Sequence, residues 1–379
     1  MKSELIPYNK PFIAPNQSKY LNELISHSLV DSDGHFSKDC QKWINNQTGC
    51  LSSLLTPSCT AALEMSAIAL NLKVDDEIIM PSYTFSSSAS AFVLRGAKPV
   101  FIDVRKDTLN IDETLIEDAI TKNTKAILVV HYAGVACEMD KIIHIAKKYN
   151  IPVIEDAAQG VMSSYKGNSL GSIGNMGAYS FHSTKNIISG EGGALLINDK
   201  NFLDSIEIIR EKGTDRSKFL RGEVDKYTWQ DVGSSFLPSE ITSAFLLSQL
   251  EYAKEITNQR LEIYKKYYNL FEDLESKGVV YRPKVTQDSI HNAHIFYIIL
   301  NNSVDREKLI LQLKKKGIYC TSHYVPLHSS PAGIKYCRQN SELVVTNRIS
   351  EKILRLPLWV GLTSSQQQYV HESIHDLIN

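Results

Sequence analysis

Short apolar runs alternate with helix-like stretches through the first half of the chain, and this alternation restricts the fold more than any other feature. The runs rich in Ile and Val are residues 75–85, 97–104, 126–134 and 151–158. The stretches with apolar residues at helical spacing are 58–72, 112–122 and 139–150. Repeated strand and helix units of this length predict a largely parallel sheet with helices on both faces, which is an α/β fold.

The pattern changes in the middle of the chain. Residues 177–182 and 192–199 read as two short strands joined by a loop without a helix, and they predict an antiparallel or irregular addition to the sheet. A long helical stretch over 239–276 then leads to a strand at 294–300, a helix at 306–317 and a strand at 318–327. We therefore predict a large domain, 1–251, and a smaller C-terminal α/β domain, 252–379.

Charge and composition exclude several classes of protein. The 379 residues carry 41 basic and 42 acidic side chains, so no net charge attracts nucleic acid or an anionic membrane. The N-terminal segment lacks the apolar run of a secretory signal, and no apolar stretch approaches the length that spans a bilayer, so we expect a cytoplasmic protein. The six cysteines form no Cys-x-x-Cys pair, which favours free thiols over disulfides and leaves no metal site to expect.

Two residues 29 positions apart suggest a reaction. Asp156 follows the apolar run 151–154, so it is expected at the carboxyl end of a buried strand, where open α/β sheets bind ligands. Lys185 lies in a loop followed by the glycine-rich segment 190–194. Pyridoxal phosphate requires a lysine that forms a Schiff base and a carboxylate that keeps the pyridine nitrogen protonated. Taken alone, Asp156 is equally well explained as a helix cap. Lys185 taken alone is explained as an ordinary surface lysine. The two residues together favour a cofactor site.

Further candidates surround this pair. Gln159 is placed to bind a substituent of the cofactor ring, and Ser180 precedes Lys185. The backbone amides of Thr60 and Ala61, with the Thr60 hydroxyl, open a predicted helix and offer a site for the cofactor phosphate. The ring of Tyr83 follows the next strand and is a candidate to stack on the cofactor. A plain helix cap at Thr60 and a core position for Tyr83 remain the simpler alternatives.

Ordered motifs along essentially the whole chain resemble the sugar aminotransferases of the DegT/DnrJ/EryC1/StrS family, which have the pyridoxal phosphate-dependent aspartate aminotransferase-like fold (type I). The matching segments are NKPF, SDGHFSKDCQKW, SCTAALEM, MPSYTF, VHYAGVACEMD, EDAAQGVMSSYKG, SFHSTKN, EGGALLIND, REKGTDRS, DKYTWQDVGSSF, HYVPLH and RLPLW.

The resemblance implies a role for each candidate residue. Lys185 takes the role of the Schiff-base lysine, Asp156 binds the pyridine nitrogen and Gln159 lies near the phenolic oxygen of the ring. Thr60, Ala61 and Ser180 become phosphate ligands, and Tyr83 stacks on the ring.

The resemblance further implies a homodimer with active sites at the subunit interface. Many relatives carry a GxN segment whose asparagine reaches the cofactor phosphate of the partner subunit. This chain has Gly233-Ser234-Ser235 there, so Ser235 is expected in a weaker or water-mediated role.

The resemblance implies amino transfer from L-glutamate to C4 of dTDP-4-keto-6-deoxy-D-glucose, with pyridoxamine phosphate as the intermediate cofactor form. The products are dTDP-4-amino-4,6-dideoxy-D-galactose, a precursor of surface polysaccharide such as enterobacterial common antigen, and 2-oxoglutarate. The C-terminal segment with His323, Tyr324, Pro326 and His328 is expected near the sugar or nucleotide.

Three alternatives stay open. The first is an aminotransferase for a 3-keto or differently configured sugar, or for a UDP-linked one. The second is a pyridoxamine phosphate-dependent dehydratase, which Lys185 disfavours because such relatives typically have a histidine at that position. The third is a cofactor-binding regulator, which would need a DNA-binding segment that the sequence does not show.

Overall fold

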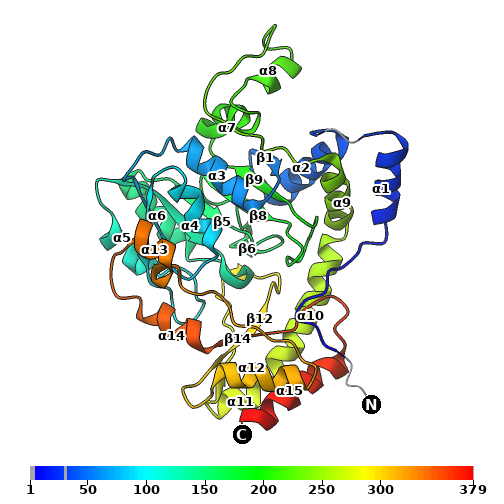
Figure 1. Ribbon diagram of the computed structural model, residues 1–379, viewed down its shortest axis with the longest axis vertical. Helices are drawn as coiled ribbons and strands as arrows, with labels where there is room; N and C mark the ends of the chain where they lie inside the picture. The colour runs from blue at the N-terminus through cyan, green and yellow to red at the C-terminus, as the bar shows by residue number, and fades with distance from the viewer. Residues whose placement is uncertain (1–4, 30–31, 379) are drawn as a thin grey trace.

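The computed structural model describes residues 5–29 and 32–378. The first four residues of the N-terminal segment and the outer limits of the two predicted domains, residues 1 and 379, lie outside this range. The fold is α/β, as predicted: a mostly parallel sheet carries helices on both faces, and a smaller set of elements lies below it (Figure 1).

The large sheet has eight strands in the order β1-β9-β8-β5-β4-β2-β3-β13. Their bounds are β1 (Ser52–Thr56), β2 (Glu77–Pro81), β3 (Lys98–Ile102), β4 (Thr124–Val130), β5 (Val153–Asp156), β8 (Met176–Ser180), β9 (Gly193–Ile197) and β13 (Arg338–Gln339). From β8 to β13 neighbouring strands are parallel, whereas β9 is antiparallel to both β8 and β1. The predicted antiparallel addition is therefore present, and it holds the loop that carries Lys185.

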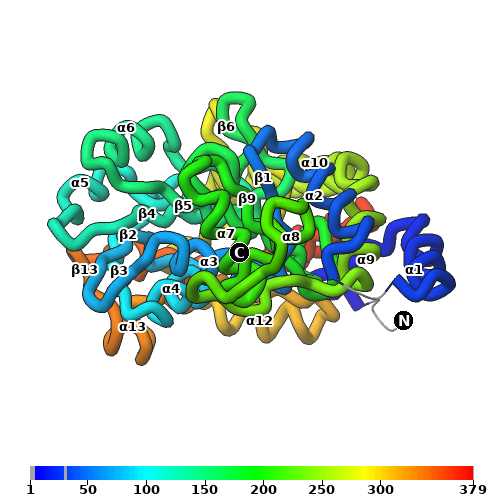
Figure 2. Tube along the Cα trace, turned by 90° about the horizontal axis from the view of Figure 1, so that it is seen from above, coloured from blue at the N-terminus to red at the C-terminus, as the bar shows by residue number. Residues whose placement is uncertain are grey.

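Two layers of helices cover the sheet (Figure 2). One apolar cluster joins the sheet to α2 (His35–Thr48), α5 (Ile116–Ala119), α6 (Met139–Tyr149) and α9 (Glu240–Glu251). A second cluster joins the other face to α3 (Cys59–Ala69), α4 (Ser86–Val93) and α7 (Leu203–Arg210). The strands are buried on both faces, which explains why their sequences are continuous apolar runs instead of alternating ones.

The C-terminal part begins where the predicted long helix breaks. Residues 239–276 form α9, α10 (Ala253–Leu270) and α11 (Glu272–Ser276), with interruptions at Tyr252 and Phe271. An antiparallel sheet follows, made of β10 (Val280–Tyr281), β12 (Phe296–Leu300) and β14 (Ile353–Leu356). It packs with α10, α12 (Arg306–Lys315) and α15 (Ser364–Ile378) around a separate core that includes Tyr267, Phe271 and Phe296.

Shorter elements complete the fold. They are α1 (Gln17–Ser26), α8 (Arg216–Leu220), α13 (Pro331–Tyr336), α14 (Val344–Lys352), and a small sheet of β6 (Ser164–Tyr165), β7 (Asn168–Ser169) and β11 (Ser289–Ile290). Helix α1 lies beside α9, and α8 projects away from the sheet (Figure 1). No helix in the described part of the chain is both long and apolar enough to cross a membrane.

Two further predicted elements differ from the structure. Residues 318–327 form no strand, because they make only isolated bridges at Ile318 and Thr321 before Tyr324 adopts a left-handed backbone with φ of 47°. The predicted helix 112–122 shrinks to a 3-10 turn (Glu113–Leu115) followed by α5, because Ile120 already has an extended backbone.

The N-terminal segment packs on the C-terminal part of the molecule. Ile6 is buried in the core around Phe296, its N–H donates to Gly317 O (2.9 Å), and its carbonyl accepts from the Tyr319 N–H (3.1 Å). The Trp359 indole N–H also donates to Pro7 O (3.1 Å). Residues from the two ends of the chain therefore share one core.

A buried glutamate fixes the loop that leads into β8. Glu155 on β5 is fully buried and accepts the N–H groups of Gly171, Ile173 and Gly174 at 2.6–2.8 Å. The His131 Nε2 lies 2.8 Å from the same carboxylate. The Glu155 side chain thus satisfies three backbone donors and a buried ring, so replacing it is costly.

We expect Glu155→Gln to lower the free energy of unfolding by about 3 kcal/mol, because an amide cannot accept all of these hydrogen bonds and leaves buried donors unsatisfied. Urea denaturation measures this change. Glu351→Gln, on the exposed surface of α14, is the matched control and should shift the midpoint little. Equal unfolding free energies for the two variants would show that the hydrogen bonds of Glu155 do not stabilise the fold.

Candidate active site

Asp156 is the last residue of β5 and lies at the carboxyl edge of the parallel strands, as predicted. Its side chain is 6% exposed. Oδ2 accepts a hydrogen bond from the Ser88 hydroxyl (2.6 Å), and Oδ1 accepts the Ala158 N–H (3.1 Å). Two neutral donors thus orient the carboxylate, and no described basic side chain forms an ion pair with it.

Lys185 lies in the loop between β8 and β9. Backbone pairing of Ser180 with Gly193, and of His182 with Gly190, closes this loop, and the Lys185 N–H donates to His182 O (2.9 Å). Burial lowers the pKa of the Lys185 amine, while the nearby Cys59 and Asp156 act in the opposite direction. The structure therefore brings Lys185 and Asp156 into one electrostatic environment, and burial makes the amine easier to deprotonate.

Ser88 is a site residue that the sequence did not reveal. It lies in α4, whose sequence SSSAS resembles a polar loop, so only the fold shows that its hydroxyl reaches Asp156.

We expect Ser88→Ala to reduce kcat about 10- to 100-fold, because a hydrogen bond to a charged group contributes about 1.5–3 kcal/mol. Steady-state kinetics measures the loss, and the melting temperature checks the fold. Ser90→Ala, on the exposed side of the same helix, is the control. A Ser88→Ala enzyme with unchanged kcat would show that the hydroxyl does not position Asp156.

The first turn of α3 offers a site for an anion. Ser58 caps this helix, and its hydroxyl accepts the Ala61 N–H (3.1 Å). The Ala61 amide, expected from sequence to bind a phosphate, is therefore already engaged. The amides of Cys59 and Thr60 have no partner within the helix. The charges of Asp156 and Lys185 influence the pKa of Cys59, which places this turn beside the site.

Gln159 and Tyr324 form a hydrogen-bonded pair at the edge of the site. The Gln159 Oε1 accepts the Ala133 N–H (2.7 Å), and its Nε2 donates to the Tyr324 hydroxyl (2.9 Å). Asp156 is among the causes that raise the pKa of Tyr324, although burial is the largest. Gln159 thus lies near Asp156 as expected, with both polar atoms engaged.

Tyr83 does not have the position that ring stacking requires. Its side chain is 1% exposed, its ring packs 5.4 Å from that of Tyr132 and 5.6 Å from that of Tyr324, and its hydroxyl donates to His323 O (2.5 Å). The core alternative is the one that the structure supports, because Tyr83 has no free face. Phe85 is 59% exposed, and its ring lies 6.4 Å from that of Tyr324.

The C-terminal segment divides between the site and the core. His323 is close enough to the Tyr132 hydroxyl for a hydrogen bond at Nδ1 (2.7 Å), and burial together with Lys185 lowers its pKa to about 3. His323 is therefore a neutral hydrogen-bonding group beside the lysine. His328 is buried and lies 2.7 Å from the Ser82 hydroxyl, at the end of β2.

The remaining serines differ in setting. Ser180, at the end of β8, is 5% exposed, and its hydroxyl accepts the His182 N–H at 3.4 Å. Ser235 is exposed and pairs with Glu211 at the base of the projection that includes α8. The hydrogen bonds of the described residues do not bring Ser235 together with Asp156 and Lys185.

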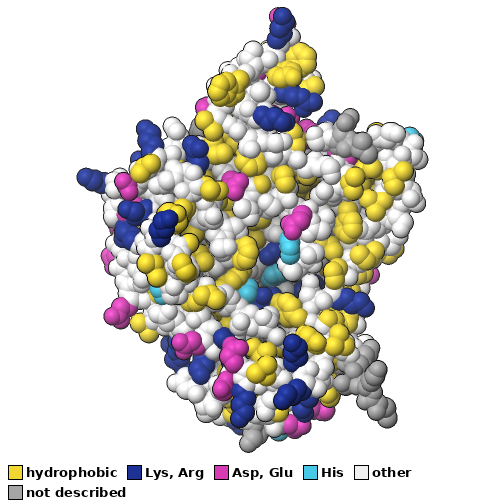
Figure 3. Space-filling view, in the orientation of Figure 1, with side chains coloured by type: hydrophobic (Ala, Val, Ile, Leu, Met, Phe, Trp, Pro, Cys, Tyr) yellow, Lys and Arg dark blue, Asp and Glu magenta, His cyan; other side chains and the backbone are white. Residues whose placement is uncertain are grey.

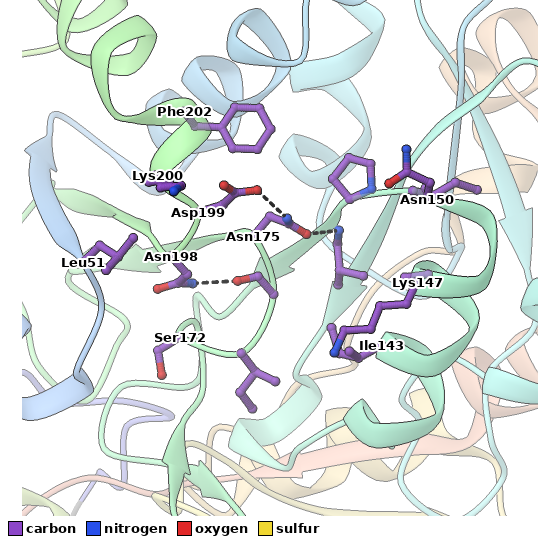
Figure 4. Close-up of a pocket in the computed structure, with 16 residues that line it drawn as sticks. Leu51, Ile143, Lys147, Asn150, Ser172, Asn175, Asn198, Asp199, Lys200 and Phe202 are labelled. Atoms are coloured by element: carbon purple, nitrogen blue, oxygen red, sulfur yellow. Dashed lines mark hydrogen bonds between the residues drawn. The ribbon is translucent and has the colours of Figure 1, made fainter.

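A cavity of about 810 Å³ lies at the opposite end of the sheet (Figure 4). It borders Val153, where β5 begins, and its asparagines hold the backbone together. Asn175 accepts the Val153 N–H (2.9 Å) and donates to Asp199 (3.0 Å), and Asn198 donates to Gly174 O (2.9 Å). The hydrogen bonds of these asparagines hold the surrounding loops in place. The cavity lies where β5 begins, so it is separate from the candidate active site at the other end of the strand.

This sheet, with an aspartate at a central strand end and a lysine in the following hairpin, defines an aminotransferase fold of the pyridoxal phosphate type I class. The solved structures of Spr1654 from Streptococcus pneumoniae, in PLP and PMP forms, superpose with a TM-score of 0.89 at 24% identity over 99% of this chain and 98% of that one. The chain belongs to the DegT/DnrJ/EryC1/StrS aminotransferase family, whose model matches residues 11–375.

Two curated relatives align over nearly their full lengths. GDP-perosamine synthase of Escherichia coli O157:H7 is 29% identical over 98% of this chain and 98% of its own. The spore coat polysaccharide biosynthesis protein SpsC of Bacillus subtilis is 29% identical over 100% of this chain and 98% of its own. These comparisons confirm the family resemblance and identify the chain as a sugar aminotransferase.

Proposed function

We propose that this chain is dTDP-4-amino-4,6-dideoxygalactose transaminase, a pyridoxal phosphate-dependent enzyme that transfers the amino group of L-glutamate to C4 of dTDP-4-keto-6-deoxy-D-glucose. The observation that carries the reaction class is the lysine in the loop beside the strand-end carboxylate. The acceptor rests on the motif resemblance. GDP-perosamine synthase, whose name specifies a nucleotide-linked product, supports a nucleotide sugar in general.

The donor set fits pyridoxal phosphate. The carboxylate of Asp156 suits a protonated ring nitrogen, the free first-turn amides of α3 suit a phosphate, and the exposed Phe85 suits a ring face. When bound, the cofactor supplies an electron sink for the carbanion formed at the amino-acid carbon. In this proposal Phe85 takes the stacking role first expected for Tyr83.

The residues of the chain perform the proton transfers. Lys185 Nζ, whose pKa burial lowers, takes the proton from the α-carbon of glutamate in the first stage. In the second stage the same nitrogen returns a proton to C4 of the sugar. The Ser88 hydroxyl and the Ala158 N–H hold the Asp156 side chain in place throughout. The neutral His323 and Tyr132 pair can accept or donate hydrogen bonds beside the lysine without adding a second charge.

Product analysis tests the acceptor. The purified enzyme is incubated with glutamate and dTDP-4-keto-6-deoxy-D-glucose, and NMR of the product gives the aminated carbon and its configuration. We expect dTDP-4-amino-4,6-dideoxy-D-galactose. Amination only of the 3-keto isomer or of a UDP-linked sugar would replace this acceptor with that alternative. Loss of a sugar hydroxyl without amination would favour the dehydratase.

We also propose a homodimer, supported by the projection formed by residues 211–236. This arm extends from the sheet (Figure 1) and exposes the large apolar side chains Tyr227 (50%), Trp229 (79%) and Val232 (47%). Exposed apolar groups gathered on one projection are typical of a protein interface. Light scattering should give twice the mass of the 42.6 kDa chain, and a monomer at micromolar concentration would reject the dimer.

A further inference from the structure

Two loops extend the candidate site beyond the end of the large sheet. The turn 157–162 follows Asp156, and the loop 181–192 carries Lys185. The pairing of β5 with β8 ends at Asp156 and Ala178. Among the described residues, no hydrogen bond runs directly between the turn and the loop. The hydrogen bonds that join the two loops run instead through a third segment, which belongs to the C-terminal part of the chain.

Asn292 connects this third segment to both loops. It is 1% exposed, and its Nδ2 donates to the carbonyls of Gln159 (2.8 Å) and Val161 (2.7 Å) in the turn. Its own carbonyl accepts from Nδ2 of Asn186 (2.8 Å), the residue after Lys185. Because only the nitrogen of a side-chain amide can donate to a carbonyl, these contacts fix the orientation of both amides.

The oxygen of the Asn186 side chain gives the loop a second attachment. Asn186 is 6% exposed, and its Oδ1 lies 3.0 Å from Nδ1 of His294. An amide oxygen can only accept, so Nδ1 of His294 carries the proton. Burial, with a smaller contribution from the charge of Lys185, lowers the pKa of His294, so this ring is neutral and lies near the amine. One buried side chain thus holds the lysine loop through both its donor and its acceptor.

Residues 292–294 are themselves held in place from two sides. Arg260, on α10, donates to the carbonyls of Ala293 (3.1 Å) and His294 (2.7 Å). Gly134, in the loop after β4, lies so close that a methyl group on it would meet Oδ1 of Asn292 at 2.1 Å. Figure 3 shows His and Lys or Arg side chains in the hollow where the large sheet meets the C-terminal part. Contacts from both parts of the molecule therefore fix the segment between them.

We infer that residues 292–294, which we call the brace, hold the Asp156 turn and the Lys185 loop at a fixed separation, with Asn292 and Asn186 as positioning residues. The inference rests on the proposed function for the roles of Asp156 and Lys185. Proton transfer requires the amine close to the carbon atom that loses the proton, and a misplacement of about 1 Å can cost about 100-fold in rate. The two asparagines act through the loops that they hold, as supporting hydrogen bonds around a reactive group do.

Hydrogen–deuterium exchange of the full chain tests whether the brace couples the two loops. The side chain of Asn292 donates only to the turn, and its Oδ1 has no hydrogen-bond partner. We nevertheless expect Asn292→Ala to accelerate amide exchange about tenfold in the loop 181–192 as well as in the turn 157–162. Asn186→Ala, which removes contacts of the loop alone, should likewise accelerate exchange in the turn. Exchange that changes only in the segment that each side chain contacts would overturn the inference.

Steady-state kinetics separates positioning from substrate binding. In the enzyme loaded with pyridoxal phosphate, Asn292→Ala should lower kcat about 10- to 100-fold and change the KM values for glutamate and the nucleotide sugar less than about threefold. The double variant Asn292→Ala with Asn186→Ala should lose no more than the worse single variant, because both substitutions break the same connection. Losses that multiply would show that the two asparagines act independently and would contradict the brace.

Asn301→Ala is the matched control. Asn301 also lies in the C-terminal part, and its side chain donates to a carbonyl, that of Gly278 (3.0 Å), but neither residue belongs to the two loops. This variant should leave kcat and the exchange of both loops unchanged. If Asn292→Ala does not fold, Asn186→Ala serves for both measurements, because it leaves the carbonyls of the turn paired.

The two proposals fail separately. If the loaded wild type releases no 2-oxoglutarate from glutamate, the proposed function is wrong. Coupled exchange in the two loops would then still establish the brace. If the wild type does release 2-oxoglutarate, and both asparagine variants match it in exchange and in kcat, the brace is wrong and the aminotransferase remains.

Discussion

Lys185→Ala should abolish amino transfer, with kcat reduced by more than about 10⁴-fold, the upper range for a single general acid–base group. In our proposal the same amine both attaches the cofactor and moves the proton, so alanine removes two contributions at once. Coupled detection of 2-oxoglutarate and NMR of the sugar product measure the loss in each stage.

The control for this variant is Lys200→Ala. Lys200 is exposed at the far end of the sheet, beside the cavity of Figure 4, and its removal should leave kcat unchanged. The fold of Lys185→Ala should also be intact, because no described side chain forms an ion pair with its amine. A folded Lys185→Ala enzyme with wild-type turnover would eliminate the lysine as the reactive amine.

Asp156→Asn should reduce kcat by about 10²–10³-fold, the usual loss when one preorganised electrostatic contact to a developing charge is removed. Asparagine nearly preserves the shape and can still pair with the Ser88 hydroxyl and the Ala158 N–H, so the melting temperature should change little. The loss is therefore attributed to charge, because the carboxylate is what keeps a ring nitrogen protonated. Stopped-flow measurement of the glutamate stage locates the effect.

Asp118→Asn, an exposed position on α5, serves as the comparison. Asp156→Glu retains the charge at a displaced position and should recover part of the activity. If Asp156→Asn keeps more than half of the wild-type kcat, the carboxylate does not support the chemistry. The proposal that Asp156 keeps the cofactor ring nitrogen protonated would then be wrong.

The strands of the large sheet could be predicted from the sequence because their apolar composition matches their buried position in the fold. The runs that became β2, β3, β4 and β5 are buried on both faces, so their apolar composition marks both the strand and its central place. The absence of a helix between 182 and 192 likewise indicated the antiparallel turn that carries Lys185. The predicted fold class is confirmed for these reasons.

Side-chain environments were harder to predict because long-range packing determines them. Tyr83 was a plausible stacking residue until Tyr132 and Tyr324, distant in sequence, covered its ring. Ser88 could not be told from its serine neighbours in the sequence. Its hydroxyl contacts Asp156, which lies 68 positions away. The segment 318–327 has strand-like composition, but the left-handed backbone at Tyr324 ends its pairing.

The N-terminal segment also has a consequence for the order in which the chain folds. Ile6 forms backbone hydrogen bonds with Gly317 and Tyr319, so the segment around Ile6 pairs with residues that are made more than 300 positions later. Contacts of such high sequence separation form late and slowly. During synthesis the large sheet can assemble while the segment around Ile6 is still unpaired. A substitution that removes the Ile6 side chain should therefore disturb a late step of folding, the closure of the C-terminal core, and not the assembly of the large sheet.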